Sequence, residues 1–436
     1  MKIIRAGAFT LMSLTLSILL LAAPDARAME GPGPWCVGTM ELLGQENLSH
    51  ADAAARLLAQ QTLPERTETV PLRSVYVDAQ AAGPGDGSEA RPFGEIQTAV
   101  DDARPGDRII VAPGDYQPVL VRTSGTAEHP IVIAGQADGA ARPVIDGASH
   151  TFKLRGLIAV RGASHITVSG FRLQNAPRDG IFVEGTIDGE RGIRILDNDI
   201  DTTGNSAIFV AGIVMRYITK VDEYRLFDVL VEGNRVTNTN VPDGVNEAIS
   251  LGAGVDGFVI RNNYIFDTRQ YGIDAKAGAI NGVITDNVIH GIADHGIYID
   301  AGSRTLAHID IRRNAVLGAR NGIVLARESL RDPEHPNLYD VEVTDNFVMD
   351  VEEYGIMVYR HKFDSAKGLF EDITLRGNCL CQIERDAVRL GGIGDFARNV
   401  RVESNLIMSS GGGVWNKIGA AEAENQLAAP TSVCAP

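Results

Sequence analysis

Apolar and polar residues alternate along short segments through most of the chain. One phrase recurs: valine or isoleucine at every second position, then an asparagine, then a second apolar run that often begins Gly-Ile. Copies include FVIRNNYI with GIDA, VITDNVI with GIYI, and IDIRRNAV with GIVL. A period of two indicates β-strands, and no helical pattern separates them. The phrase therefore predicts strands that follow one another in coils and stack coil upon coil.

An asparagine occupies the same point of each phrase. Its spacing of about 24 to 36 residues is that of a solenoid repeat. One asparagine in every coil is a packing rule, so we interpret the series as a ladder of stacked amides that satisfies turn backbone, not as a row of ligands. The series comprises Asn198, Asn234, Asn263, Asn287, Asn314, Asn346, Asn378 and Asn405.

These patterns predict an all-β fold, a single-stranded right-handed parallel β-helix of about ten coils with an N-terminal helical cap. We expect the β-helix over residues 74–416, with a short helix around Glu95–Ala103 covering its open end. Residues 29–73 are expected to form an N-terminal extension with a helix over Ser49–Gln61, which begins with a good N-cap. Residues 417–436 are rich in alanine and read as a flexible tail.

The first 28 residues have the pattern of a signal peptide. Lys2 and Arg5 precede an apolar run that ends at the small-residue site Ala26-Arg27-Ala28. We therefore expect export, to the periplasm or outside the cell, without membrane insertion. The four cysteines suit an oxidising compartment. Their pairing is open, and the two that lie close together, Cys379 and Cys381, lack the second ligand pair of a zinc site.

The formal net charge of −16 argues against a nucleic-acid partner, because such partners meet basic patches. It does not exclude an acidic substrate, since a local cation can hold a carboxylated sugar on an acidic protein. A monomer that binds a polysaccharide is the expectation.

The repeat resembles the pectate-lyase-like superfamily of right-handed β-helix proteins over roughly residues 74 to 416. The opening segment is similar too, in the phrases YVDAQAAGPGDGSEARPFGEIQTAVDDARPGDRIIVAPGDYQPVLV and SGTAEHPIVIAGQ. The resemblance implies the fold. It leaves the activity open, because the superfamily includes lyases, hydrolases, epimerases and non-enzymatic binders.

Polar chemistry gathers on two adjacent coils. Outward-facing positions of the Gly-Ile strands carry Asp274 and Lys276 in one coil and Tyr298 and Asp300 in the next. In register, these groups converge within about 5 to 10 Å. The turns entering these strands add Glu247, Tyr271 and His295, and one coil further on Arg327 and Glu328 stand at the root of a long loop. His290 is a weaker acid–base candidate.

Three functions fit this cluster. A polysaccharide lyase, placed first, would use Lys276 as the base of a β-elimination if neighbouring groups lower its pKa, with Tyr298 and His295 in supporting catalytic roles. Possible Ca²⁺ ligands are Glu247, Asp274 and Asp300. Tyr271, Arg327 and Glu328 would bind the sugar.

An inverting glycoside hydrolase would instead use the paired carboxyls Asp274 and Asp300, with Lys276 tuning their pKa values. A non-catalytic polysaccharide-binding or export scaffold is the third reading. A cluster without a function is a further alternative, because outward strand positions carry polar residues in any β-helix and Lys276 and Asp300 can form a solvated ion pair.

Overall fold

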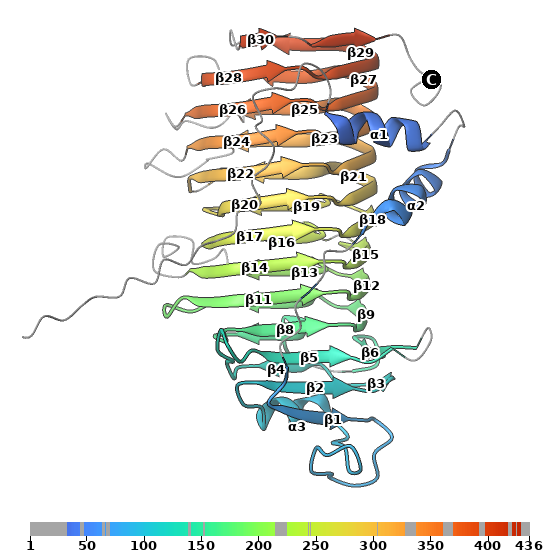
Figure 1. The fold of residues 1–436 in the computed structure, drawn as a ribbon, viewed down its shortest axis with the longest axis vertical. Helices are drawn as coiled ribbons and strands as arrows, with labels where there is room; N and C mark the ends of the chain where they lie inside the picture. The colour runs from blue at the N-terminus through green and yellow to red at the C-terminus, as the bar shows by residue number, and fades with distance from the viewer. Residues whose placement is uncertain are drawn as a thin grey trace, which may run out of the picture.

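The computed structural model describes residues 33–43, 48–62, 66, 70–137, 141–150, 153–213, 225–242, 244, 246–302, 304–327, 337–360, 369–391, 397–416, 421–423 and 425–428. The predicted signal peptide and most of the predicted tail lie outside these residues. Within them the chain forms a rod of stacked parallel strands, with its N-terminal helices against one side (Figure 1).

The first face of the rod is one parallel sheet that takes one strand from each coil. It contains thirteen strands of the described chain, more than the ten coils that the asparagine repeat suggested, because the first coils lack the asparagine. The strands are β1 (Arg73–Val77), β2 (Asp107–Val111), β5 (Ile131–Gly135), β8 (Ile166–Ser169), β11 (Glu190–Leu196), β14 (Leu226–Glu232), β17 (Val255–Arg261), β20 (Ile280–Thr285), β22 (Leu306–Arg312), β24 (Leu338–Thr344), β26 (Phe370–Arg376), β28 (Ala397–Glu403) and β30 (Ala421–Ala423).

The second and third faces carry the two strands that follow in each coil. In the early coils these are separate strands, and all of their ladders are parallel. The second face has β3 (Gly114–Asp115), β6 (Pro143–Asp146), β9 (Arg172–Ala176), β12 (Asp199–Thr203), β15 (Arg235–Thr239) and β18 (Tyr264–Thr268). The third face has β4 (Val119–Val121), β7 (Gly156–Arg161), β10 (Asp179–Glu184), β13 (Ile208–Ala211), β16 (Ile249–Leu251) and β19 (Ile273–Lys276).

In the later coils one long strand runs over both faces and bends between them. Register shifts mark the bend, for example between Ile292 and His295. The strands are β21 (Val288–Asp300), β23 (Ala315–Arg327), β25 (Phe347–Arg360), β27 (Cys379–Gly391) and β29 (Leu406–Asn416), and the short β31 (Gln426–Ala428) pairs with β29.

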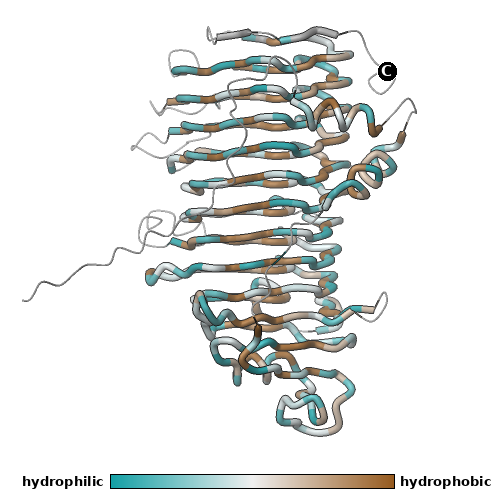
Figure 2. The backbone as a smooth tube through the Cα atoms, in the orientation of Figure 1, coloured by the Kyte–Doolittle hydropathy of each residue, from teal (hydrophilic) through white to brown (hydrophobic). Residues whose placement is uncertain are grey.

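The core fills the rod from end to end. Every second side chain of a strand points inward, and apolar and polar residues alternate along the coils (Figure 2). One continuous cluster of buried residues extends from Val75 in β1 to Ile407 in β29. Burying a valine or isoleucine side chain stabilises the fold by about 1.5–3 kcal/mol, so this cluster is the main source of the rod's stability.

The asparagines form a ladder of amides, as the repeat predicts. Each side-chain Nδ2 donates to the Oδ1 of the next asparagine, and the ladder continues one step further than expected, to Asn425. These N–O distances lie between 2.9 and 3.1 Å. The same Oδ1 also accepts the backbone N–H of the preceding ladder residue, so the amides satisfy turn backbone in every coil.

The N-terminal helices α1 (Pro34–Leu43) and α2 (His50–Gln60) pack beside the later coils (Figure 1). Ser49 caps α2 by accepting the N–H of Asp52. A disulfide joins Cys36 of α1 to Cys379 of β27, and Cys381 is also disulfide-bonded. Cys434 lies outside the described residues. This disulfide attaches α1 covalently to the rod. The helices α1 and α2 together are called the N-terminal hairpin below.

The third helix, α3 (Ile96–Asp101), lies at the N-terminal end of the rod beside β1 and β4. It lies within the segment expected to be helical, and Ile96, Ala99 and Val100 are buried in the core cluster. None of the helices among the described residues is long and apolar enough to cross a membrane.

Candidate active site

The predicted polar cluster lies where β19 and β21 pair on the third face. Asp274 is opposite Tyr298, and Lys276 is opposite Asp300. The preceding strand places Ser250 opposite Asp274. The register assumed from the sequence is therefore correct.

Lys276 is held between two carboxylates. Its Nζ lies 2.6 Å from Oε1 of Glu247 and 2.9 Å from Oδ2 of Asp274. The three side chains are exposed by only 13%, 5% and 1%, so the pairs lie almost wholly out of water. Glu247 comes from the turn before β16, one coil earlier than the lysine, and it makes the shorter of the two contacts.

These contacts raise the pKa of Lys276, although burial alone would lower it, because Asp274 and Glu247 both favour the ammonium. The sequence hypothesis required a lowered pKa, and in this respect it is wrong. An ammonium that keeps its proton at neutral pH does not remove a proton from a sugar. Lys276 therefore acts as a fixed positive charge in this arrangement.

The pKa of Asp274 is raised well above its ordinary range. Burial is the main cause, and the neighbouring carboxylates of Glu247 and Asp300 add to it, while Lys276 opposes it. Three carboxyls around one ammonium leave an excess of negative charge in a poorly hydrated place. Retaining a proton on Asp274 relieves that excess.

A calcium ion does not fit between the three carboxylates expected to bind it. Glu247 and Asp274 both point at the ammonium of Lys276, which takes the position that a metal would need. Among the residues that the structure describes, no group of three or more histidine, cysteine or acidic side chains is arranged to hold a metal ion.

Aromatic side chains border the charged cluster. The rings of Tyr271 and His295 stack, with centroids 4.7 Å apart, and Tyr298 is tilted against both at 4.7 and 5.0 Å. The hydroxyl of Tyr298 lies 3.4 Å from that of Tyr359, two coils further on. The predicted turn residues Tyr271 and His295 are thus in contact with the predicted strand residue Tyr298.

Two polar residues that sequence reasoning missed contact His295. Its Nδ1 lies 3.0 Å from Oδ1 of Asp294 and 3.2 Å from Nδ2 of Asn321. Burial tends to raise the pKa of Asp294, but the hydrogen bond to His295 and the charges of His295 and Arg320 together lower it. The adjacent Asp-His pair was a visible signal in the sequence. Asn321 was not, since its contact depends on the register of β21 and β23.

The remaining predicted residues either have other surroundings than the charged cluster or lie outside the residues that the structure describes. Arg327 is fully buried at the end of β23, where its guanidinium lies 5.4 Å from the ring centroid of Phe370, on the first face. This environment is not that of a residue in an open groove. Glu328 lies outside the described residues. His290 is on the second face, where its Nε2 lies 2.8 Å from the hydroxyl of Tyr264.

Access to the cluster is limited. Asp274, Tyr298 and Glu247 are buried, whereas Lys276, Asp300, Tyr271 and His295 are partly exposed. Among the described residues the cluster is therefore a largely buried site and not an open surface. A ligand would reach the cluster through its partly exposed members.

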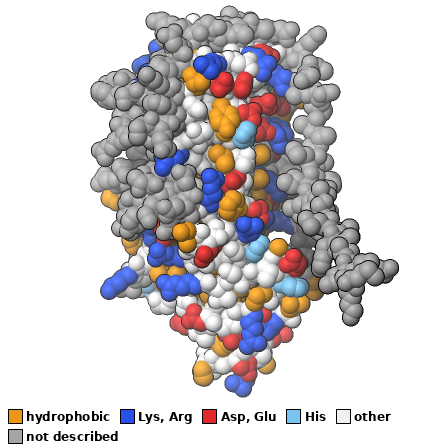
Figure 3. Space-filling view, turned by 90° about the vertical axis from the view of Figure 1, so that its left-hand side faces the viewer, with side chains coloured by type: hydrophobic (Ala, Val, Ile, Leu, Met, Phe, Trp, Pro, Cys, Tyr) orange, Lys and Arg blue, Asp and Glu red, His pale blue; other side chains and the backbone are white. Residues whose placement is uncertain are grey.

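The charge of the visible surface is mixed. Acidic and basic side chains are interspersed along the strip of described residues seen from the side of the rod (Figure 3). Elsewhere on the described surface, charged side chains form ion pairs between neighbouring coils, such as Arg194 with Asp228 at 2.7 Å and Arg235 with Asp199 at 2.9 Å. Such exposed pairs contribute little to stability individually.

Comparison with known proteins supports the fold. Residues 75–262 match the family model described as "Pel9A-like, right handed beta helix region". The uncharacterized protein YwoF of Bacillus subtilis (strain 168) is 25% identical over 213 residues, which are 46% of this chain and 43% of that protein. The match thus spans less than half the length of this relative.

Solved structures are similar in fold at low identity. A hyperthermoactive exopolygalacturonase from Thermotoga maritima is 13% identical, covering 84% of this chain and 93% of its own, with a TM-score of 0.50. Pectate lyase Pel9A is 13% identical, covering 81% and 80%, with a TM-score of 0.48. The chain is a right-handed parallel β-helix protein, and the resemblance to the pectate-lyase-like proteins is confirmed at the level of the fold.

Proposed function

We propose that this protein is an exported enzyme that hydrolyses a polysaccharide, with its active site at the charged cluster of β19 and β21. The observation that carries the proposal is the buried pair Asp274 and Glu247 in contact with the ammonium of Lys276, with the partly exposed Asp300 opposite Lys276 on the neighbouring strand. A buried carboxyl with a raised pKa, as at Asp274, beside a second carboxyl on the neighbouring strand is typical of acid–base sites.

The arrangement supplies the two carboxyls that inverting hydrolysis requires. Asp274, which retains its proton, would donate it to the glycosidic oxygen as the bond to the leaving sugar breaks. Asp300, one strand away and offset by two residues, would take a proton from the attacking water. The two residues are on adjacent strands of one face, and inverting enzymes likewise place an acid and a base carboxyl about 6.5–9.5 Å apart.

Lys276 then has a positioning and electrostatic role. Its charge limits the rise in the pKa of Asp274 and would attract an acidic sugar. Tyr271, which is partly exposed, presents a ring on which a sugar can stack, and the buried Tyr298 supports that ring from below.

A second candidate function is β-elimination of a uronic acid polymer, the function that the sequence placed first. The contact of His295 with Asp294 favours it, because an oriented histidine is a suitable base near neutral pH. Lys276 would neutralise the uronate carboxylate, and His295 would remove the neighbouring carbon-bound proton. No step in either scheme uses a calcium ion.

A panel of acidic and neutral polysaccharides tests both schemes. Each reaction is followed in two channels, the appearance of reducing ends and the ultraviolet absorbance of unsaturated products. Hydrolysis predicts reducing ends without the absorbance, and β-elimination predicts both. A pure binding protein gives neither signal with any polymer and overturns both proposals.

Matched variants identify the residues. For hydrolysis, Asp274→Asn should lower kcat by about 100-fold or more, because it removes the proton donor. Asp267→Asn is the control, since it makes the same change at an exposed position of the second face. His295→Ala should abolish an elimination but only weaken a hydrolysis. Full activity of a folded Asp274→Asn protein would refute the hydrolytic role of this residue.

A further inference from the structure

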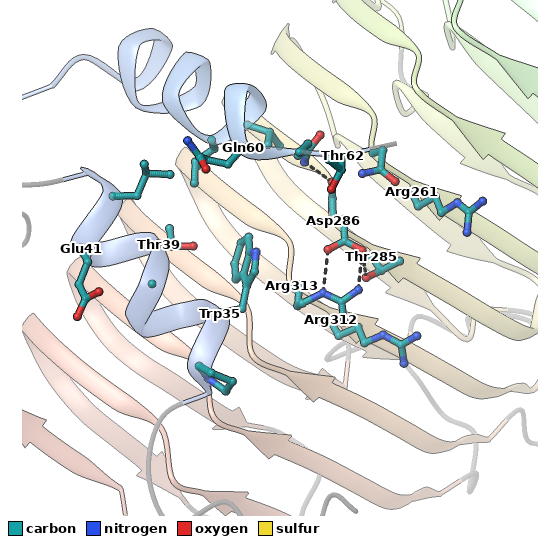
Figure 4. Close-up of a pocket in the computed structure, with 17 residues that line it drawn as sticks. Trp35, Thr39, Glu41, Gln60, Thr62, Arg261, Thr285, Asp286, Arg312 and Arg313 are labelled. Carbon is teal, nitrogen blue, oxygen red and sulfur yellow. Dashed lines mark hydrogen bonds and ion pairs between the residues drawn. The ribbon is translucent and has the colours of Figure 1, made fainter. Parts of the chain in front are cut away.

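A large cleft lies between the N-terminal hairpin and the rod, away from the third face. Its volume is about 990 Å³, within the range of ligand-binding sites (Figure 4). Helix α1 contributes Trp35 and Leu42, and the end of α2 contributes Leu57 and Gln60. The opposite wall comes from the turns between the first and second faces, and its charged residues are Arg261, Asp286, Arg312 and Arg313.

The walls of this cleft are held in place independently of any ligand. The disulfide between Cys36 and Cys379 fixes α1 to the rod. Asp345 accepts the backbone N–H groups of Cys36 at 2.9 Å and Trp35 at 3.3 Å. At the other end, Nε2 of Gln61 donates to the backbone oxygen of Asp286 at 2.6 Å. A preformed cleft binds without the cost of ordering its walls.

The chemistry of the walls suits a sugar. Trp35 is only half-buried, and in Figure 4 its ring stands between α1 and the pair formed by Arg313 and Asp286. That pair is doubly hydrogen-bonded, at 2.8 and 2.7 Å, so its groups are rigidly oriented. A tryptophan ring offers an apolar face to a pyranose, while amide and guanidinium groups bond its hydroxyls.

One arginine of the lining is placed to meet a carboxylated sugar. Of the three arginines that line the cleft, Arg261 is ion-paired with Glu232 and Arg313 with Asp286. Arg312 is hydrogen-bonded through Nη1 to Asp310, and its side chain remains 36% exposed. Guanidinium groups bind carboxylates through paired, charge-assisted hydrogen bonds.

We propose that this cleft is a separate, non-catalytic binding site for a short stretch of carboxylate-bearing polysaccharide, with Trp35 stacking on a sugar ring and Arg312 facing a carboxylate. The site does not depend on the proposed hydrolytic activity. It would keep a polymer attached to the rod between reactions at the third face.

Intrinsic fluorescence tests the proposal directly, because the chain has two tryptophans. In a Trp415→Phe, Asp274→Asn protein, Trp35 is the sole reporter and the suspected acid is absent. Titration with tetragalacturonate or tetramannuronate should change the emission of Trp35 saturably. Added salt should weaken the binding, since the guanidinium contacts are screened.

Two arginine variants locate the response. Arg312→Gln should raise the Kd by about tenfold, the effect expected for one charge-assisted contact. Arg91→Gln, at an exposed ion pair near the other end of the rod, should leave the Kd unchanged. Trp35→Leu should remove the heat of binding in calorimetry, and its unfolding curve shows whether it folds.

The inference is overturned if neither acidic tetrasaccharide gives a saturable change. It is also overturned if neutral cellotetraose binds equally well, or if Arg312→Gln binds like the parent. Because the titration uses a catalytically disabled chain, an inactive enzyme would not produce a negative result here. The failure of this proposal and the failure of the proposed function are therefore distinguishable.

Discussion

The side chain of Lys276 shows how one contact changes a mechanism. Its strand position was readable from the sequence, because the alternating pattern places Asp274 and Lys276 on the outward side of one coil. The pairing with Glu247 was not readable in detail. It depends on a turn 29 residues earlier, whose conformation no local pattern specifies. The sequence therefore located the lysine correctly but gave the wrong direction for its pKa.

Replacing Lys276 with methionine should destabilise the protein by about 3–5 kcal/mol, because the carboxylate of Glu247 would remain buried without its cation. Urea unfolding of the variant measures this loss. Lys153→Met is the matched control at an exposed position and should change the free energy of unfolding little. A loss below about 1 kcal/mol would show that the buried pairs do not hold the cluster together.

Asp274 should make stability depend on pH. Its folded pKa is raised, so the native state binds this proton more tightly than the unfolded chain does. Below the unfolded pKa the carboxyl is protonated in both states. As pH rises from the unfolded pKa to the folded pKa, the unfolded chain loses this proton first and the free energy of unfolding decreases. Asp274→Asn should therefore gain stability relative to the parent between about pH 4 and pH 7. The opposite trend, measured by urea unfolding, would contradict the raised pKa.

At the scale of the element, the turn that carries each ladder asparagine has a second requirement. The residue before the asparagine adopts a positive φ, as in Asp197 at 54°, Asn262 at 55° and Gly377 at 66°. Aspartate, asparagine and glycine are the residues that tolerate this conformation best. The Asp-Asn, Asn-Asn and Gly-Asn pairs of the repeat thus encode a turn, which explains why the register of the coils could be read from the sequence.

The ladder should be strongest in its interior. Asn287→Ala removes hydrogen bonds to Asn314 and to the backbone oxygen of Ile260, and leaves buried backbone unsatisfied. We expect a loss of about 2–4 kcal/mol in the free energy of unfolding. Asn425→Ala, at the partly buried end of the ladder, should cost less. Equal losses at both positions in urea unfolding would show that the ladder does not stabilise coils through its interior amides.

At the scale of the molecule, the fold was predictable because the same pattern of strands and turns recurs in each coil. A misinterpreted pattern in one coil does not change the predicted fold. The asparagine signal undercounted the coils at both ends: the coils of β1, β2, β5 and β8 lack the asparagine, and the coil of β30 lies in the segment predicted to be a flexible tail. The site was harder, because function lies where the repeat is broken. The sequence brought Asp274, Lys276, Tyr298 and Asp300 together correctly, but it missed Asp294 and gave Arg327 a role that its burial does not support.

The whole protein should be insensitive to chelators. Lys276 occupies the position between Glu247 and Asp274 that the predicted Ca²⁺ would need, so removing calcium should change neither Tm nor activity. Differential scanning calorimetry with EDTA, and after adding Ca²⁺ back, measures the first quantity. A calcium-dependent rise in Tm that Asp300→Asn abolishes would restore the metal site expected from the sequence.

The central claim is that buried carboxyls, and not the lysine, carry out the chemistry at β19 and β21. Time-resolved proton NMR of the reaction on the best polysaccharide from the panel tests it most directly. The claim predicts new anomeric signals of inverted configuration, no vinylic signal, and loss of both turnover and new signals in Asp274→Asn. A vinylic signal that persists in Asp274→Asn and disappears in Lys276→Met would contradict it, because the lysine would then be the base.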